Sequence, residues 1–273
     1  MEILVCIKQV PADMEVRIDP QTGTLMRDGI ECIVNPFDRL ALELAVQHKE
    51  RHGGSVTVLS MGPRQTETAL RECLAVGADE AWLASDRTFG GADTLATSYV
   101  LAQAARAIMQ RKNIGGFDLV LCGKQAMDSD TAQVGAELAE ILDLPQVTGA
   151  VGFEQAAGGY LVLRERKAAV DQVKVQGPCV LTIGNAQVAP RYPTMKSKMA
   201  SMKAQVSILG PGDMDGLEPE RTGSTGSPTK VAEVCVIPHE KDAVMFGGSI
   251  EEIAGSMADV LQGMVCGNGG RQA

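Results

Sequence analysis

The sequence predicts an α/β protein with a mostly parallel, doubly wound sheet, and two observations support this class. Short β-branched runs, expected as buried strands, alternate with longer segments of helical period. The runs lie at 3–7, 56–61, 81–85 and 118–123, and the helical segments at 36–51, 65–76, 93–112 and 131–142. Aromatic residues make up only 3% of the 273 residues, so the core must be aliphatic. Such alternation indicates βαβ units whose helices cover both faces of the sheet.

The helix expected at 131–142 illustrates the pattern. Val134, Leu138, Ile141 and Leu142 fall at i, i+4, i+7 and i+8, which places them in one apolar stripe. That stripe predicts a helix lying on the sheet rather than a helix surrounded by solvent.

The second half of the chain has a different pattern. Runs at 161–167, 170–175 and 179–183 predict a short antiparallel addition to the sheet, and a last strand is expected at 206–209. The segment 211–230 is rich in Gly, Pro, Ser, Thr and Asp and is interpreted as a linker. Ser249 and Glu252 have the spacing of a capping box for a final helix.

Three regions follow from this organisation: an α/β domain at 1–210, the linker at 211–230, and a C-terminal arm at 231–273. A single helix beyond a linker has little of its own domain to pack against. We therefore expect the arm to pack on another chain.

Composition excludes several classes of protein. The net charge is −9 and no basic run is present, which argues against a nucleic-acid partner. The seven cysteines include no CxxC pair, which favours reduced thiols over disulfides or a zinc site. The short apolar run at the N-terminus is not a signal sequence, and no 20-residue window is free of charge. The expectation is a cytoplasmic protein with no membrane insertion.

Ligands of open parallel sheets bind at the carboxyl ends of the strands. The residues that follow the first four expected strands are 6–11, 61–63, 85–86 and 123–125. Each of these segments contains Gly, Pro or polar residues, as a ligand-binding cleft requires. Any one of them is compatible with an ordinary βα turn. Together they predict a ligand site at this edge.

Two predicted helix starts lie beside the same edge. Asp130 with Gln133 has capping-box spacing, which would leave the backbone N–H groups of 131–134 available to an anion. Asp93 or Thr94 is expected to cap the second helix, after Gly90 and Gly91. A plain cap is the simpler interpretation of each start, whereas two on one edge would suit the two phosphates of a dinucleotide. No GxGxxG or P-loop motif is present.

Two further patterns have competing interpretations. His48 and His52 are spaced i, i+4, but a third metal ligand is missing and the face is charged, so we expect a solvated helix surface. Met195, Met199 and Met202 lie among lysines at helical spacing. They predict either a helix packed on its own sheet or an adaptable docking surface.

Six segments in order along the chain resemble the β subunit of electron-transfer flavoproteins. They are LVCIKQVPAD (4–13), NPFDRLALELAVQHKE (35–50), VLSMGP (58–63), ALRECLAVGADEA (69–81), DLVLCGKQAMDSDTAQVG (118–135) and PRYPTMKSKM (190–199). The resemblance covers nearly the whole chain. It implies a domain of the adenine-nucleotide α-hydrolase-like type, paired with an α subunit that holds an exchangeable FAD.

The resemblance also implies which residues bind a second nucleotide. Carried over by motif, they are Cys6, Asn35, Pro36, Phe37, Asp38, Met61, Gly123, Lys124, Gln125, Ala126, Met127, Asp128, Ser129, Asp130, Thr131, Ala132, Gln133 and Val134. The methionine and lysine segment, at about 184–204, corresponds to the family's recognition loop for acyl-CoA dehydrogenase-type partners. A stand-alone nucleotide-dependent enzyme using Lys124, Asp128 and Asp130 is a further hypothesis.

The identity of the second nucleotide divides the family. It is AMP in ordinary members and FAD in flavin-bifurcating members, which accept electrons from NADH and divide them between ferredoxin and the α-subunit FAD. The segment SDRTFGGADTLATS (85–98) resembles the bifurcating pattern. Its matching residues are Asp86, Phe89, Gly91, Asp93, Thr94 and Thr97. The resemblance therefore favours FAD, with AMP as the alternative.

Overall fold

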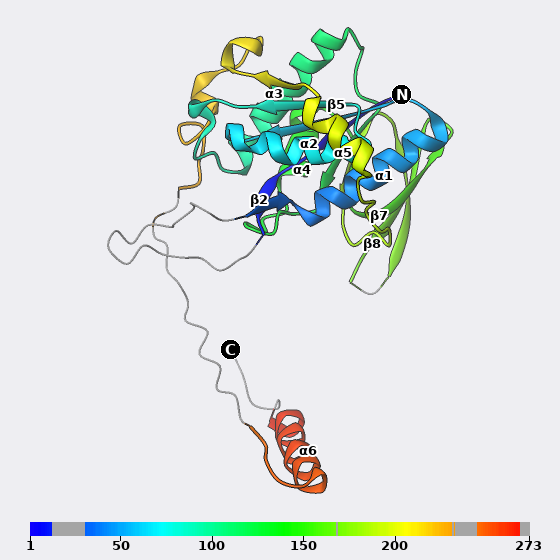
Figure 1. Cartoon of the computed structure of the whole chain (residues 1–273), viewed down its shortest axis with the longest axis vertical. Coiled ribbons are helices and arrows are strands. Elements are labelled where there is room, and N and C mark those ends of the chain that lie inside the picture. The colour runs from blue at the N-terminus through cyan, green and yellow to red at the C-terminus, as the bar shows by residue number, and fades with distance from the viewer. Residues whose placement is uncertain (13–30, 168, 231, 233–244, 268–273) are drawn as a thin grey trace. The chain divides into compact units, whose positions relative to one another are not determined.

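The computed structural model describes residues 1–12, 31–167, 169–230, 232 and 245–267 (Figure 1). The chain divides into two compact units, Met1–Lys230 and Val231–Ala273. In the second unit, α6 spans Ile250–Gly267. The Ser249 N–H donates to Glu252 Oε2 at 2.8 Å and the Glu252 N–H donates to Ser249 Oγ at 3.3 Å, which confirms the predicted capping box.

Within the described part of the first unit, nine strands form one sheet, in the order β11-β5-β4-β1-β6-β10-β7-β8-β9. The strands are β1 (Glu2–Cys6), β4 (Ser55–Met61), β5 (Glu80–Ala84), β6 (Leu119–Gly123), β7 (Gln146–Ala156), β8 (Gly159–Glu165), β9 (Val170–Gln176), β10 (Cys179–Ile183) and β11 (Val206–Leu209). The pairs from β11 through to β7 are parallel, and β8 and β9 are antiparallel. A second, two-stranded antiparallel sheet joins β2 (Gln9–Pro11) to β3 (Cys32–Val34).

Helices cover both faces of the large sheet, as the alternating pattern predicts. On one face, α1 (Pro36–His52) and α2 (Glu67–Ala75) bury Leu42 and Leu70 against the strands. On the other, α3 (Thr94–Lys112) and α4 (Val134–Leu142) bury Ile108 and Leu138. The last helix of the unit, α5 (Met195–Lys203), packs against α2, in front of it in Figure 1. The α/β class with a mostly parallel sheet is confirmed.

The prediction that 179–183 is antiparallel is wrong. This segment is β10, which lies between β6 and β7 and is parallel to both. All five of its residues are buried, as expected for a central parallel strand covered on both faces. The 11-residue β7 was not predicted, because Gly149 and Gly152 interrupt its apolar pattern and the register shifts beside them.

The linker expected at 211–230 packs against α3 instead. The Glu218 N–H donates to the Tyr99 hydroxyl at 2.8 Å, and the Arg221 guanidinium lies 4.0 Å from the centre of the Tyr99 ring. Ser227 is buried, and its Oγ accepts the Asp93 N–H at 2.8 Å. These contacts mostly use backbone groups and small side chains, which a compositional criterion cannot distinguish from those of a linker.

The solvated position expected for His48 is also wrong. His48 is 4% exposed and packs beside Phe153 and Tyr160, with ring centroids 5.1 and 5.9 Å away. Among the described residues, no group of His, Cys, Asp and Glu has the arrangement of a metal site.

His48 should make stability depend on pH. Burial, together with the charges of His52 and Arg51, lowers its pKa to about 4 from 6.5. The unfolded chain therefore binds the proton first, and stability present above pH 6.5 is lost as the pH falls towards 4. We expect His48→Phe to remove this contribution, which is at most about 3 kcal/mol, and so to change the difference in the free energy of unfolding between pH 7.5 and 5.0 relative to the wild type, measured by urea denaturation. His52→Phe is the matched control, and an unchanged pH dependence in His48→Phe would contradict the assignment.

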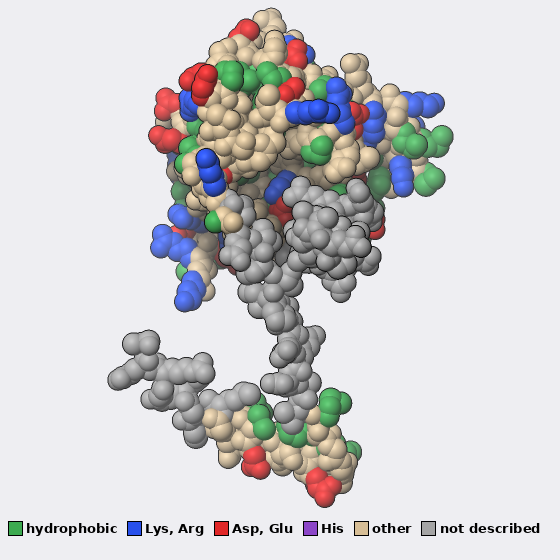
Figure 2. Space-filling view, turned by 90° about the vertical axis from the view of Figure 1, so that its left-hand side faces the viewer, with side chains coloured by type: hydrophobic (Ala, Val, Ile, Leu, Met, Phe, Trp, Pro, Cys, Tyr) green, Lys and Arg blue, Asp and Glu red, His purple; other side chains and the backbone are tan. Residues whose placement is uncertain are grey.

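Four of the cysteines, Cys6, Cys73, Cys122 and Cys179, are buried free thiols, as the sequence predicts. Acidic and basic side chains are mixed on the face shown in Figure 2, where the described residues form no continuous basic surface. In the described ranges, no helix has both the length and the hydropathy needed to cross a bilayer.

Candidate functional site

The chain reverses its direction of winding between β1 and β6. From β1 the strands proceed to β4 and β5 on one side, whereas β6 and β10 lie on the other side. Because β1 and β6 are parallel neighbours, their carboxyl ends diverge into two loops at this point. Open α/β sheets bind ligands at such a switch point.

Asp38, in the first turn of α1, connects the two loops. Its Oδ2 accepts the Lys8 N–H at 2.7 Å, and its Oδ1 accepts the Gly123 N–H at 3.0 Å. Burial raises the pKa of the Asp38 carboxyl to about 7, although both N–H bonds act in the opposite direction. A side chain at Gly123 would overlap Oδ1, so glycine is required for this close approach. One buried carboxylate therefore sets the spacing across the switch point.

Asn35 organises the loop after β6. It precedes α1 but makes no side-chain cap. Instead its Nδ2 donates to the Gln125 carbonyl at 2.9 Å, and its Oδ1 accepts the Met127 N–H at 3.2 Å. Asn35 is 1% exposed, so its predicted role as a nucleotide contact is better described as shaping the loop that would hold the nucleotide.

An ion pair joins the two loops at the surface. Lys8 Nζ lies 2.6 Å from Asp128 Oδ1 and 3.5 Å from Ser129 Oγ. Lys124 is exposed nearby, and its N–H donates to the Ile183 carbonyl of β10 at 2.7 Å. The acidity of this stretch is therefore partly neutralised by Lys8.

The prediction that Asp130 caps the following helix is wrong. The helix α4 begins at Val134, and Gln133 occupies the N-cap position without a side-chain hydrogen bond. Asp130 has a φ of 53° and bonds the Gln125 side chain, and Ala132 has a φ of 56°. Two left-handed residues turn the chain before the helix can start; local bonds of Asp130 and the non-local contacts of Asn35 to the same loop hold this turn.

The resulting helix start fits an anion better than the predicted one. The N–H groups of Val134, Gly135 and Ala136 have no carbonyl one turn earlier within the helix. Ala132 with positive φ precedes Gln133 with right-handed φ and ψ, and such alternation lets successive N–H groups converge on one anion. The positive end of the helix dipole adds to this attraction. The donor set therefore fits a nucleotide phosphate.

The start of α3 lies beside that of α4. Asp93 caps α3 by accepting the Ala96 N–H at 3.0 Å, as predicted. Thr94 Oγ1 donates to Glu137 Oε1 at 3.0 Å, and Ser98 Oγ donates to Glu137 Oε2 at 3.1 Å. The two helix starts that the sequence places on one edge are thus joined by the Glu137 carboxylate.

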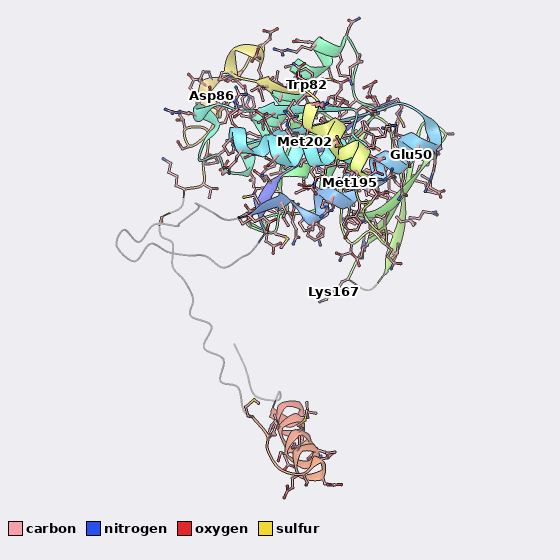
Figure 3. All side chains as sticks on the ribbon, in the orientation of Figure 1. Glu50, Trp82, Asp86, Lys167, Met195 and Met202 are labelled. Carbon is pink, nitrogen blue, oxygen red and sulfur yellow. The ribbon has the colours of Figure 1, made fainter. Side chains whose placement is uncertain are left out.

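Several other residues of the segment 85–98 make contacts that stabilise the fold itself. Asp86 accepts the N–H and hydroxyl of Thr88, which lowers the pKa of Asp86 (labelled in Figure 3). Phe89 is 4% exposed and packs in the core between the sheet and α3. Gly91 has a φ of 72°, and a Cβ there would lie 3.2 Å from Ser224 Cβ. Phe89 and Gly91 therefore have structural roles beside any role towards a ligand.

Comparison with known proteins identifies the family. The model of the electron transfer flavoprotein domain matches residues 22–213. Electron transfer flavoprotein subunit beta of Thermoanaerobacterium thermosaccharolyticum is 44% identical over 262 residues, which are 96% of this chain and 98% of that one. The chain belongs to the electron transfer flavoprotein β-subunit family.

Two further relatives have more specific names. The caffeyl-CoA reductase-Etf complex subunit CarD of Acetobacterium woodii is 42% identical over 264 residues, covering 96% of this chain and 98% of CarD. Protein FixA of Azorhizobium caulinodans is 41% identical over 237 residues, covering 86% of this chain and 84% of FixA. Members of this family transfer electrons, associate with flavin or nucleotide, and pair with an α subunit.

In this electron transfer flavoprotein subunit, three methionines form an exposed surface on α5. Met195, Met199 and Met202 are 77%, 61% and 71% exposed, and Figure 3 labels the first and the last. Of the two interpretations of these methionines, packing on the chain's own sheet is excluded. The exposed face is available to a partner.

The remaining site residues have mixed positions. Cys6 and Met61 end β1 and β4; Cys6 is buried, and its thiol raises the pKa of Cys122 by hydrogen bonding. Pro36 is exposed and Phe37 is half-buried at the start of α1. Glu137 was not predicted as a site residue. The only sequence signal for it is a carboxylate in the first turn of an apolar helix, which is typical of many helices.

Proposed function

We propose that this chain is the β subunit of a heterodimeric electron transfer flavoprotein that binds FAD at the β1/β6 switch point. With its α subunit it accepts electrons from NADH and divides them between ferredoxin and, through the α-subunit FAD, an acyl-CoA dehydrogenase-type enzyme. The observation that carries the proposal is the pair of adjoining helix starts joined by Glu137.

FAD needs more of this edge than AMP does. One phosphate is satisfied by the start of α4 alone, whereas a pyrophosphate with an attached isoalloxazine extends towards the start of α3. Thr94 is half-buried there and its hydroxyl donates to Glu137, whereas Ser98 is buried behind it and ties Glu137 to α3. FAD, when bound, supplies hydride and single-electron chemistry, and the protein supplies binding, orientation and electrostatics.

AMP is the second candidate, and a specific observation favours it. Phe89 is buried and Gly91 accommodates Ser224, so two of the residues that suggested FAD serve the fold. A chain that binds AMP structurally and carries electrons only through the α-subunit FAD would keep both residues for packing.

The residues of this chain have distinct roles in the proposed site. The N–H groups at the start of α4 bind phosphate, and Lys8 and Lys124 offset its charge. Asp38 and Asn35 position the loops that carry these groups. The third hypothesis, an enzyme that uses Lys124, Asp128 and Asp130, is disfavoured because Asp128 pairs with Lys8 and Asp130 bonds Gln125.

The partners follow from the two remaining surfaces. The C-terminal arm at 231–273 packs on the α subunit, and the recognition segment at about 184–204 docks the dehydrogenase through the exposed methionines of α5. The name of the Acetobacterium woodii relative, which belongs to a caffeyl-CoA reductase-Etf complex, supports a CoA-thioester-reducing partner. The complex works in the cytoplasm.

Counting the bound nucleotides tests the proposal. The chain is co-expressed with its α subunit, the purified heterodimer is denatured with acid, and the released nucleotides are separated and quantified. Two FAD and no AMP per heterodimer is the expected result. One FAD and one AMP would replace the proposal by the structural AMP function, and turnover of nucleotide by the isolated chain would favour the enzyme hypothesis.

The start of α3 can be tested by a double substitution. Thr94→Val with Thr97→Val removes both hydroxyls, including the 3.0 Å bond from Thr94 to Glu137. We expect the affinity for the β-site FAD to fall about tenfold, as for one or two lost hydrogen bonds. The α-site FAD serves as an internal control, and Thr94→Ser with Thr97→Ser keeps the hydroxyls. Equal retention of both flavins by the valine variant would exclude this helix start from the site.

A further inference from the structure

The helix α5 is held in an unusual way. It has nine residues, of which only Ser201 is buried among the described side chains of the helix. A helix this short is marginal in water unless it buries an apolar face. Here the apolar side chains, Met195, Met199 and Met202, point away from the protein. Something other than hydrophobic burial must keep α5 helical.

The N-terminal end of α5 is fixed by polar contacts. Thr194 and Ser197 form a capping box, in which Thr194 Oγ1 accepts the Ser197 N–H at 3.1 Å. Three residues before Thr194, the Arg191 guanidinium bonds both Glu43 and Glu50 of α1; Nε lies 2.9 Å from Glu43 Oε2. The lead-in to the helix is therefore attached to α1.

The C-terminal end is fixed by a single arginine of α2. Arg71 Nη1 donates to the carbonyls of Ser201 at 3.0 Å, Met202 at 3.3 Å and, more closely, Ala204. Carbonyls in the last turn of a helix have no partner within the helix. The positive guanidinium also lies at the negative end of the helix dipole. Arg71 thus satisfies the groups whose exposure would unwind α5.

We infer that Arg71 is a positioning residue for partner docking: it holds α5 in the helical form that presents its three methionines together. This rests on the proposed docking function of α5. The lysines Lys196, Lys198 and Lys203 alternate with the methionines, so the surface fits an apolar groove with an acidic rim. A partner binds only the helical fraction of α5, and its apparent affinity falls with that fraction.

The expected consequence is a change in affinity without a change in chemistry. In Arg71→Met, which keeps much of the aliphatic side chain, the carbonyls of Met202 and Ala204 lose this donor and that of Ser201 keeps only the Ala204 N–H. The intact αβ heterodimer is assayed with a purified short-chain acyl-CoA dehydrogenase, with the heterodimer as the varied component. The KM should rise about tenfold, while kcat and the nucleotide content stay at the wild-type values. Arg71→Lys, which retains one charged donor group, should recover part of the loss.

Arg64→Met is the matched control. Arg64 lies in the short helical turn just before α2. Like Arg71 it pairs with Glu67: Arg64 Nη1 lies 3.5 Å from Glu67 Oε1, and Arg71 Nη2 lies 3.8 Å from Glu67 Oε2. Unlike Arg71, Arg64 donates to no residue of α5. The two variants therefore remove the same charge from the same neighbourhood. Hydrogen exchange of the amides at 195–204, followed by mass spectrometry, should accelerate in Arg71→Met and not in Arg64→Met.

Met199→Glu separates failure of this inference from failure of the docking function. If Met199→Glu raises the KM but Arg71→Met does not, docking stands and the role of Arg71 is overturned. The role is also overturned if Arg71→Met accelerates exchange at α5 without raising the KM. If Met199→Glu has no effect, or the wild-type heterodimer shows no saturable exchange with the dehydrogenase, the docking function fails and this inference fails with it.

Discussion

Replacing Asp38 by alanine is expected to release the β-site nucleotide and to lower the free energy of unfolding by about 2–4 kcal/mol. The N–H groups of Lys8 and Gly123 would lose the carboxylate that accepts them in two part-buried hydrogen bonds, and bonds of this kind to a charged group contribute about 1.5–3 kcal/mol each. The loops on either side of the switch point would then separate. Nucleotide content of the purified heterodimer and urea denaturation measure the two effects.

Asp118→Ala is the matched control for this variant. Asp118 also accepts a backbone N–H, that of Glu2 at 2.7 Å, but at the opposite end of the sheet and in an exposed position. It should lower stability by less than about 1 kcal/mol and leave the nucleotide bound. Normal nucleotide content in Asp38→Ala would show that Asp38 does not set the spacing of the loops.

Asp38 should also make stability depend on pH. Its pKa in the folded protein is raised to about 7 from 3.8, so the folded state holds the proton longer than the unfolded chain does. Stability is therefore greatest below pH 3.8 on this account and falls as the pH rises to about 7. His48 acts in the opposite direction over nearly the same interval. The two effects largely offset each other in the wild type, and Asp38→Ala should reveal the rising contribution of His48.

Gly135→Ala is expected to destabilise the protein, although alanine is the better helix former by about 1 kcal/mol. Gly135 is the second residue of α4, and an added Cβ there would overlap the methyl group of Thr182 on β10. Thr182 cannot rotate away without losing the bond that its hydroxyl accepts from the Gly149 N–H at 3.1 Å. Overpacking of this kind costs about 1–3 kcal/mol, and we expect it to move the start of α4 and weaken nucleotide binding.

Thr182→Ser provides a specific suppressor of this variant. Serine lacks the obstructing methyl group but keeps the hydroxyl that Gly149 requires. Gly135→Ala with Thr182→Ser should therefore recover both the stability and the nucleotide content that Gly135→Ala loses. If the double variant is as unstable as the single one, contact between α4 and β10 is not the reason that glycine occupies position 135.

Local sequence signals were sufficient to predict the helices and strands whose apolar residues recur with a clear helical or strand spacing. The long helix α3 and its Asp93 cap follow from the sequence because the cap, the glycines before it and the apolar face are all local. The same is true of β1, β4, β5 and β6, whose apolar runs are short and bounded by turn residues.

Long-range contacts determine what the sequence could not show. The helix α4 begins at Val134 rather than at the predicted residue 131. The reason lies far away in the sequence, because the Asn35 side chain bonds the loop that precedes this helix. The place of β10 in the sheet depends on its neighbours rather than on its own residues. Asp38 looked like a ligand contact, and its bonds to two strand ends become apparent only when those ends are adjacent in space.

The cap of α3 has a consequence for synthesis of the chain. Asp93 begins the helix locally, but its second carboxylate oxygen accepts the N–H of Thr229 at 3.0 Å, 136 positions later. A ribosome makes the protein from its N-terminus at about 5–20 residues per second, so this bond forms only after nearly the whole first unit has emerged. The full set of bonds at the start of α3 is therefore completed only late in the synthesis of this unit.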